Sequence, residues 1–181
     1  AWEDAGGGDY VLISSTALSG ASSYSTDSID STYKMYKVMI NITAVGTQYA
    51  KVFMRLRVSE TDIDAANYTF AADGAFRYID SSGNGTLAEG LDDQTYYPLH
   101  GVGGLDTDTG EGVAAEMTLY HPSETVGFKN FTTQSTWLYD TSRWYVVNTG
   151  GVYKGSAAYT GITLYTSAGT MSGTINLWGV K

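Results

Sequence analysis

The 181-residue sequence contains no cysteine and only two prolines. The absence of cysteine excludes both a disulfide scaffold and a thiolate metal site. Stability must therefore come from the burial of a hydrophobic core, to which we expect oligomerisation to add. The same absence agrees with folding in a reducing cytoplasm.

Positive charge is also scarce, since 10 lysines and arginines face 19 acidic residues and give a formal net charge of -9. Such a chain would release few counterions from a polyanion, so we expect no nucleic-acid partner and no attraction to anionic membranes. No apolar run approaches the roughly 20 residues of a membrane span. The opening AWEDAGGGDY lacks the basic and apolar regions of a signal peptide. We therefore expect no membrane insertion.

What the sequence does contain is typical of an all-β protein with frequent turns. It has 22 glycines and 15 tyrosines, and 43% of its residues are hydrophobic, enough to bury a core. The length suits one domain rather than two. We predict a flexible N-terminal joint over residues 1–9, around Gly6, Gly7 and Gly8, and a single domain over residues 10–181.

The clearest strand pattern lies between Tyr33 and Ser59, where apolar residues recur at every second position on either side of a turn at residues 44–48. These apolar positions are Tyr36, Val38, Ile40, Ile42, Ala50, Val52, Met54, Leu56 and Val58. A period of two with one apolar and one polar side is typical of an antiparallel sheet that covers a core on one face.

Further strands are predicted at residues 10–14, 18–29, 67–70, 75–79, 113–120, 126–137 and 143–147. The C-terminal stretch 157–181 adds two alternating segments with a Ser/Gly turn, which predict a closing hairpin. Roughly ten strands at this spacing predict an antiparallel β-sandwich or barrel. Residues 60–66 are the only modest helix candidate, and residues 81–111 are expected to form long loops.

No cofactor, metal or catalytic site is predicted. His100 and His121 are not spaced as a metal-binding pair, and we interpret them as surface or turn residues. Asp106 and Asp108 alternate like the start of a calcium loop, but the later glutamate of that loop is missing. Carboxylates for glycoside hydrolysis could come from Asp92, Asp93, Glu111, Glu116 and Glu124, although the sequence places no two of them across a bond.

Aromatic residues are the more informative group. Candidates for surface recognition or a subunit interface, together with Asp106 and Asp108 of the acidic loop, are Tyr96, Tyr97, Trp137, Tyr139 and Trp144. Rings with polar edges stack on sugars or anchor interfaces, and the alternative is that they pack in the core.

With these pieces in order, the chain resembles a family of tailed-phage virion structural proteins, often described as tail fibre proteins. The resemblance rests on four segments: DYVLISSTALSGASSYSTDSI; the pair YKMYKVMINITAVG and KVFMRLRVS; AEMTLYHPSETVGFKNFTTQS; and, most closely, the ending GITLYTSAGTMSGTINLWGVK. It covers the chain from about Tyr10 onward. One departure is the SETDID turn after Val58, where the family more often has glycines.

The resemblance implies a jelly-roll-like β-sandwich in a homotrimer. Such a protein would be assembled in the host cytoplasm and displayed on the virion as a tail fibre, receptor-binding or capsid decoration protein. Its partners would be other virion proteins and a host surface glycan or receptor, which the loops at residues 81–111 and 138–143 would face. No enzymatic residues carry over. The alternatives are a carbohydrate-binding module and, third, a glycan depolymerase.

Overall fold

The protein is described by a computed structural model that covers residues 9–78, 83–100, 104–105, 107, 112–140 and 143–181. All regular secondary structure in these residues is β-strand. In chain order the strands are β1 (Tyr10–Ala21), β2 (Ser23–Thr26), β3 (Met35–Val45), β4 (Val52–Val58), β5 (Thr61–Asp62), β6 (Tyr68–Tyr78), β7 (Asn84–Gln94), β8 (Tyr97–Pro98), β9 (Val113–Tyr120), β10 (Lys129–Asp140), β11 (Arg143–Tyr153), β12 (Gly161–Thr166) and β13 (Met171–Val180).

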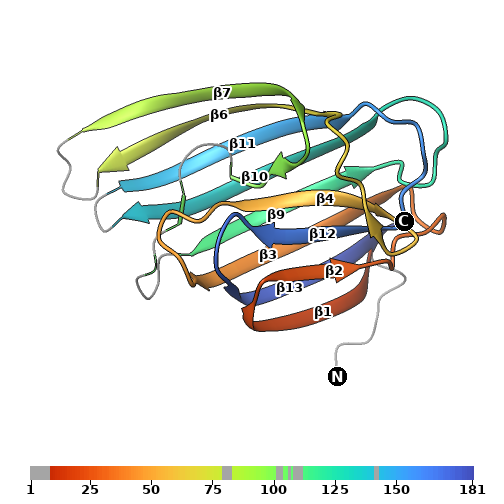
Figure 1. The fold of residues 1–181 in the computed structure, drawn as a ribbon, viewed down its shortest axis with the longest axis horizontal. Coiled ribbons are helices and arrows are strands. Elements are labelled where there is room, and N and C mark those ends of the chain that lie inside the picture. Colours follow the sequence, from red (N-terminus) through yellow and green to blue (C-terminus); the bar gives the residue numbers. More distant parts are fainter. Residues whose placement is uncertain (1–8, 79–82, 101–103, 106, 108–111, 141–142) are drawn as a thin grey trace.

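The strands form two antiparallel sheets that lie face to face (Figure 1). The larger has eight strands in the order β1-β13-β3-β9-β10-β11-β6-β7, and the smaller has the order β2-β12-β4-β5, with β8 also paired to β4. The predicted all-β sandwich is therefore confirmed, with more strands than the roughly ten expected.

The two halves of the sandwich have jelly-roll connectivity. The chain passes from one sheet to the other between β1 and β2, between β3 and β4, and again between β12 and β13. Strands β1, β13, β3 and β9 thus face β2, β12 and β4, and β5 and β8 complete the smaller sheet. This arrangement is the nested double Greek key of a jelly roll. Strands β10, β11, β6 and β7 widen the larger sheet beyond this unit, and Figure 1 shows β6 and β7 lying past the smaller sheet.

The core lies between the sheets and uses the alternation expected from the sequence. From the larger sheet it takes Tyr36, Val38, Ile40, Ile42, Met117, Leu119, Ile175 and Leu177, and from the smaller sheet Val52, Met54, Leu56, Ile162 and Leu164, all buried. Hydrogen bonds between the sheets tie the layers together. The Tyr68 hydroxyl of β6 accepts from the Leu56 N–H of β4 at 2.9 Å, and the Tyr97 hydroxyl of β8 donates to the Thr149 carbonyl of β11 at 2.7 Å.

The predicted C-terminal hairpin is wrong as a pairing. β12 and β13 follow each other in sequence, yet β12 pairs with β2 and β4 while β13 pairs with β1 and β3. The same holds for the segments around residues 36–42 and 52–58, which become β3 and β4 in opposite sheets. Alternation marks which side of each strand is buried, but it is identical for a hairpin and for two strands that face each other across a core.

Two local predictions also fail. Residues 60–66, the helix candidate, contain the short strand β5 instead. Residues 84–94, expected to be loop, form β7, which pairs along β6 at the edge of the larger sheet. An edge strand with mostly exposed side chains has little need of apolar alternation, so the acidic, glycine-rich sequence gave no strand signal.

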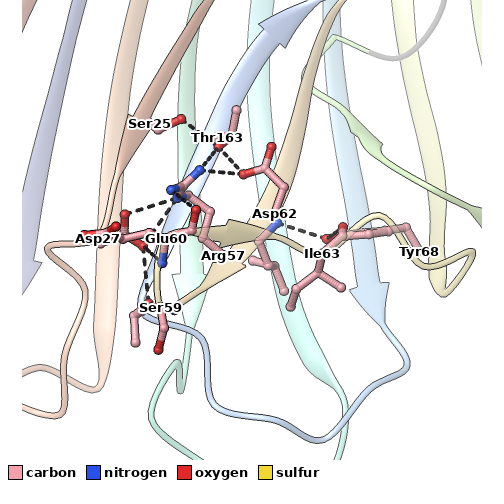
Figure 2. Close-up of polar contacts among 11 residues, drawn as sticks. Ser25, Asp27, Arg57, Ser59, Glu60, Asp62, Ile63, Tyr68 and Thr163 are labelled. Carbon is pink, nitrogen blue, oxygen red and sulfur yellow. Dashed lines mark hydrogen bonds and ion pairs between the residues drawn. The ribbon is translucent and has the colours of Figure 1, made fainter.

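A charged cluster closes the β4–β5 end of the smaller sheet (Figure 2). The Arg57 side chain, 12% exposed, reaches Asp27 at 3.2 Å and Asp62 at 2.6 Å. It also donates to the Thr163 hydroxyl at 3.0 Å and to the Glu60 carbonyl. One side chain thus links β4, the β4–β5 turn, β12 and the segment after β2.

This cluster explains how the SETDID turn forms without glycine. Ser59 and Glu60 both have positive φ, 48° and 70°, as the two central residues of a tight hairpin turn require. The Ser59 N–H donates to Thr160 and the Glu60 N–H donates to Asp27, at 3.0 and 3.1 Å. These contacts offset the cost of left-handed backbone in residues with a side chain.

Arg57→Ala is expected to lower the free energy of unfolding by about 2 kcal/mol, because two partly buried carboxylates lose their partner and the turn loses its anchor. The measurement is urea unfolding followed by tryptophan fluorescence. Arg77→Ala on the exposed face of β6 is the matched control and should change the value by no more than about 0.5 kcal/mol.

Glu60→Gly tests the backbone side of the same account. It keeps the carbonyl and N–H used by Arg57 and Asp27 and relieves the positive φ, so it should leave stability unchanged or raise it by up to about 1 kcal/mol. An equal loss in the Arg57 and Arg77 variants, or a destabilised Glu60 variant, would contradict this interpretation.

Candidate functional site

The candidate site is the outer face of the eight-stranded sheet, which we define as the side turned away from the smaller sheet. Two adjacent rows of outward side chains cross its middle from β13 to β6, one residue per strand. The first, the small-residue row, is Thr174, Asn41, Ala114, Thr136, Val146 and Ala75. The second, the polar row, is Asn176, Met39, Glu116, Gln134, Asn148 and Asp73.

A shallow groove of about 740 Å³ lies over these rows. Its outward lining consists of pairs of residues from five adjacent strands, β13, β3, β9, β10 and β11. Adjacent strands are about 4.8 Å apart, so five strands span about 19 Å. The groove therefore runs across the strands and is long enough to hold an extended ligand.

The hollow arises from the sizes of the side chains. Ala114 and the threonines of the small-residue row are short, whereas Trp144 and Met39, both in the lining, are 48% and 41% exposed. Small residues lower the floor between these two larger apolar groups. The result is a mixed surface with an apolar wall and a polar floor.

Trp144 is held in a fixed orientation on this face. Its Nε1–H donates to the Thr136 hydroxyl of β10 at 2.6 Å. By strand register it lies opposite Leu138 on one side and Arg77 on the other. The indole therefore offers an exposed ring without the freedom of an unrestrained surface side chain.

The polar row carries its own hydrogen bonds. Gln134 Nε2 donates to Asn148 Oδ1 at 3.3 Å, across the β10–β11 pair. Lys37 on β3 forms an ion pair with Glu116 on β9, and this hydrogen bond raises the pKa of Lys37 above its ordinary value. Glu116, the one charged group among the described residues that line the groove, is thereby neutralised by a neighbour.

The positions of the carboxylates do not suit glycoside hydrolysis on this face. Glu116 and Asp73 belong to the same row but stand three strands apart, about 14 Å at the backbone, whereas such pairs lie about 5 to 9.5 Å apart. Asp92 and Asp93, at the β7 edge, both pair with Lys154 at 2.9 Å. Glu111 lies outside the described residues.

The aromatic candidates separate clearly. Tyr97 and Trp137 are core residues, 0% and 2% exposed, so their assignment to a recognition surface is wrong. Tyr96 and Tyr139 are half-buried and pack on Phe53 and on Tyr49, with ring centroids 4.2 and 5.4 Å apart. Of the five rings, Trp144 alone lines the groove. Asp106 and Asp108 lie outside the described residues.

Sequence reasoning did not single out the polar row. Met39, Glu116, Gln134 and Asn176 occupy outward positions of strands that were predicted, whereas Asp73 and Asn148 lie outside the predicted ranges. No strand order was available to align them. A signal was present nonetheless. The outward positions Asn41, Gln134, Asn148 and Asn176 carry amides rather than the lysines and glutamates of an ordinary solvated face.

The comparisons with known proteins add no family. No protein-family model matches the chain, and no curated protein matches its sequence. Within the described residues, no helix is long and apolar enough to cross a membrane, and no three histidine, cysteine or acidic side chains come together as a metal site.

One histidine lies at the surface as predicted, and the other does not. His121 is exposed, with positive φ, and lies 3.2 Å from Glu124. His100 is 1% exposed, and its Nε2 accepts a hydrogen bond from the Val52 N–H at 3.0 Å. Burial, helped by the charge of Lys51, lowers the pKa of His100 to about 3, so this side chain is neutral in the folded protein at neutral pH.

His100 therefore makes stability depend on pH. Between its ordinary pKa of about 6.5 and the folded value of about 3, the unfolded chain binds a proton that the folded chain does not. We expect this group to lower the free energy of unfolding by about 1.4 kcal/mol per pH unit from pH 6 to pH 5. Urea unfolding at a series of pH values measures the slope.

His100→Gln keeps an acceptor for the Val52 N–H and removes the titrating group, so its slope should be flatter by that amount. His121→Gln, the same substitution at the exposed histidine, is the matched control. Equal slopes for the His100 variant and the unmodified protein would contradict the buried, neutral assignment.

Proposed function

We propose that this protein is a non-enzymatic, homotrimeric structural component of a phage virion. It would be displayed on the particle as a fibre, a receptor-binding protein or a capsid decoration protein, in contact with other virion proteins and the host surface. The proposal joins the family resemblance of the strand and turn pattern to the fold.

The observation that carries the proposal is the strand order. The resemblance implies a jelly-roll-like sandwich, and β1-β13-β3-β9 facing β2-β12-β4 has that connectivity. Alternating strands alone are equally compatible with an immunoglobulin-type sandwich or a closed barrel. Agreement in topology is therefore a more specific support than strand content.

The geometry of the titratable groups supports a role in binding rather than in catalysis. His100 is enclosed in the core, and Glu116 is committed to an ion pair on an open sheet face. Arg57 and its two aspartates link secondary structure elements at the end of the smaller sheet. Each of these groups has a structural partner that accounts for it.

We expect native mass spectrometry of the purified protein to give three copies, and antibodies against it to label intact, purified particles in electron micrographs. A monomer at all concentrations would contradict the trimer. Antibody that detects the protein in the lysate of infected cells but never on particles would contradict the virion assignment.

A further inference from the structure

We propose that the groove on the outer face binds a neutral, extended oligosaccharide that runs across the strands, stacked on Trp144 and hydrogen-bonded by the amides of the two rows. This deepens the proposed function by naming the ligand class of a surface-displayed protein. The inference rests on groove shape, ring exposure and charge.

The first step is the stacking platform. Trp144 exposes 48% of its surface beside a floor of short side chains, and Thr136 fixes its indole at 2.6 Å. The C–H face of a pyranose ring is apolar and packs on such a ring. Because the indole is already oriented, little side-chain entropy is lost on binding.

The second step is the set of polar partners. Asn41, Gln134 and Asn176 project into the same groove from three different strands. Each primary amide offers both donors and an acceptor, which matches sugar hydroxyls that donate and accept. Asn176 and Asn41 lie on the neighbouring strands β13 and β3, and Gln134 lies on β10, two strands beyond β3 and therefore about 9.6 Å from it. An extended sugar chain that crosses the strands would meet all three amides.

The third step is charge. Where the structure describes its lining, the groove has one charged side chain, Glu116, which Lys37 neutralises through their ion pair. Its electrostatic character therefore suits an uncharged ligand. An anionic polysaccharide would meet a protein of net charge -9 with no free cation among the described lining residues.

A second copy of the chain fits this surface less well. In a two-fold contact the same hollow would face itself, and the short side chains of the small-residue row would leave a void between the copies. An elongated ligand fills the groove along its length. We therefore assign the groove to a glycan rather than to a two-fold contact between copies.

The test is isothermal titration calorimetry of the full chain with three hexasaccharides: cellohexaose, mannohexaose and the anionic hexagalacturonate. At least one neutral hexamer should bind, and hexagalacturonate should bind at least tenfold more weakly. Trp144→Ala should lower the affinity for the neutral hexamer at least tenfold, the loss of one stacking contact.

Two further variants test whether binding depends on the groove. Gln134→Ala should weaken binding severalfold while leaving the melting temperature unchanged, since Gln134 is exposed. Phe128→Ala is the matched control, because Phe128 is an exposed aromatic residue, 60% accessible, that precedes β10 and does not line the groove. Its affinity should equal that of the unmodified protein.

The inference is overturned if neither neutral hexamer binds at millimolar concentration, if hexagalacturonate binds as tightly, or if Trp144→Ala and Phe128→Ala have equal effects. A Trp144 variant that changes the number of subunits would show instead that the groove is a contact between copies. If the protein binds a neutral hexamer but is a monomer and is absent from virus particles, the proposed virion function is contradicted and the glycan-binding site is still supported.

Discussion

The register of the central strands β13, β3, β9 and β10 is the constraint on which both the core and the candidate site depend. Along these strands every second side chain is buried, and most of these are apolar, with Thr133 and Ser135 of β10 as buried polar exceptions. The alternate side chains face outward. A slip by one residue between any two strands would exchange the two sets. The core thereby fixes the register, and the register aligns the polar row and the groove above it.

The same constraint links stability to binding. Ile40, Met117 and Ile175 have no function on the outer face, yet their burial sets where Met39, Glu116 and Asn176 project. A binding surface built on the back of a packed sheet is rigid, because its backbone is paired on both sides. The widening of the sheet by β10 and β11 supplies Gln134, Thr136 and Trp144, so the groove needs strands outside the jelly-roll unit.

The sequence predicted fold class and the buried side of most long strands correctly. Ile162, Leu164, Ile175 and Leu177, alternate apolar residues of the two predicted C-terminal segments, are buried. Pairing could not be predicted, because alternation in β12 and β13 is the same whether they form a hairpin or face each other. The edge strand β7 was missed because most of its side chains are exposed, so its sequence does not alternate between apolar and polar residues.

Individual site residues were harder to predict for a related reason. Tyr97 and Trp137 have rings with polar edges and lie near predicted turns, which favoured a surface position. Both rings are buried instead, and the Tyr97 hydroxyl donates to the Thr149 carbonyl at 2.7 Å. Whether an aromatic ring on a strand faces the core or solvent depends on which side the second sheet covers. Trp144 and Trp137 are seven residues apart on paired strands and point to opposite faces.

The C-terminal segment has a structural role different from the predicted hairpin. It is a crossing between the two sheets, and it places Thr174 and Asn176 on the outer face while Ile175 and Leu177 remain in the core. The segment that best carries the family resemblance thus also contributes one end of the proposed groove.

The central claim, that the outer face is a binding surface, is tested most directly by NMR of the ¹⁵N-labelled protein during titration with the neutral hexasaccharide that binds. The side-chain amide signals of Asn41, Gln134 and Asn176 and the indole signal of Trp144 should shift together, in a single saturable process. Shifts confined to residues 84–100, with those four signals unmoved, would contradict the account.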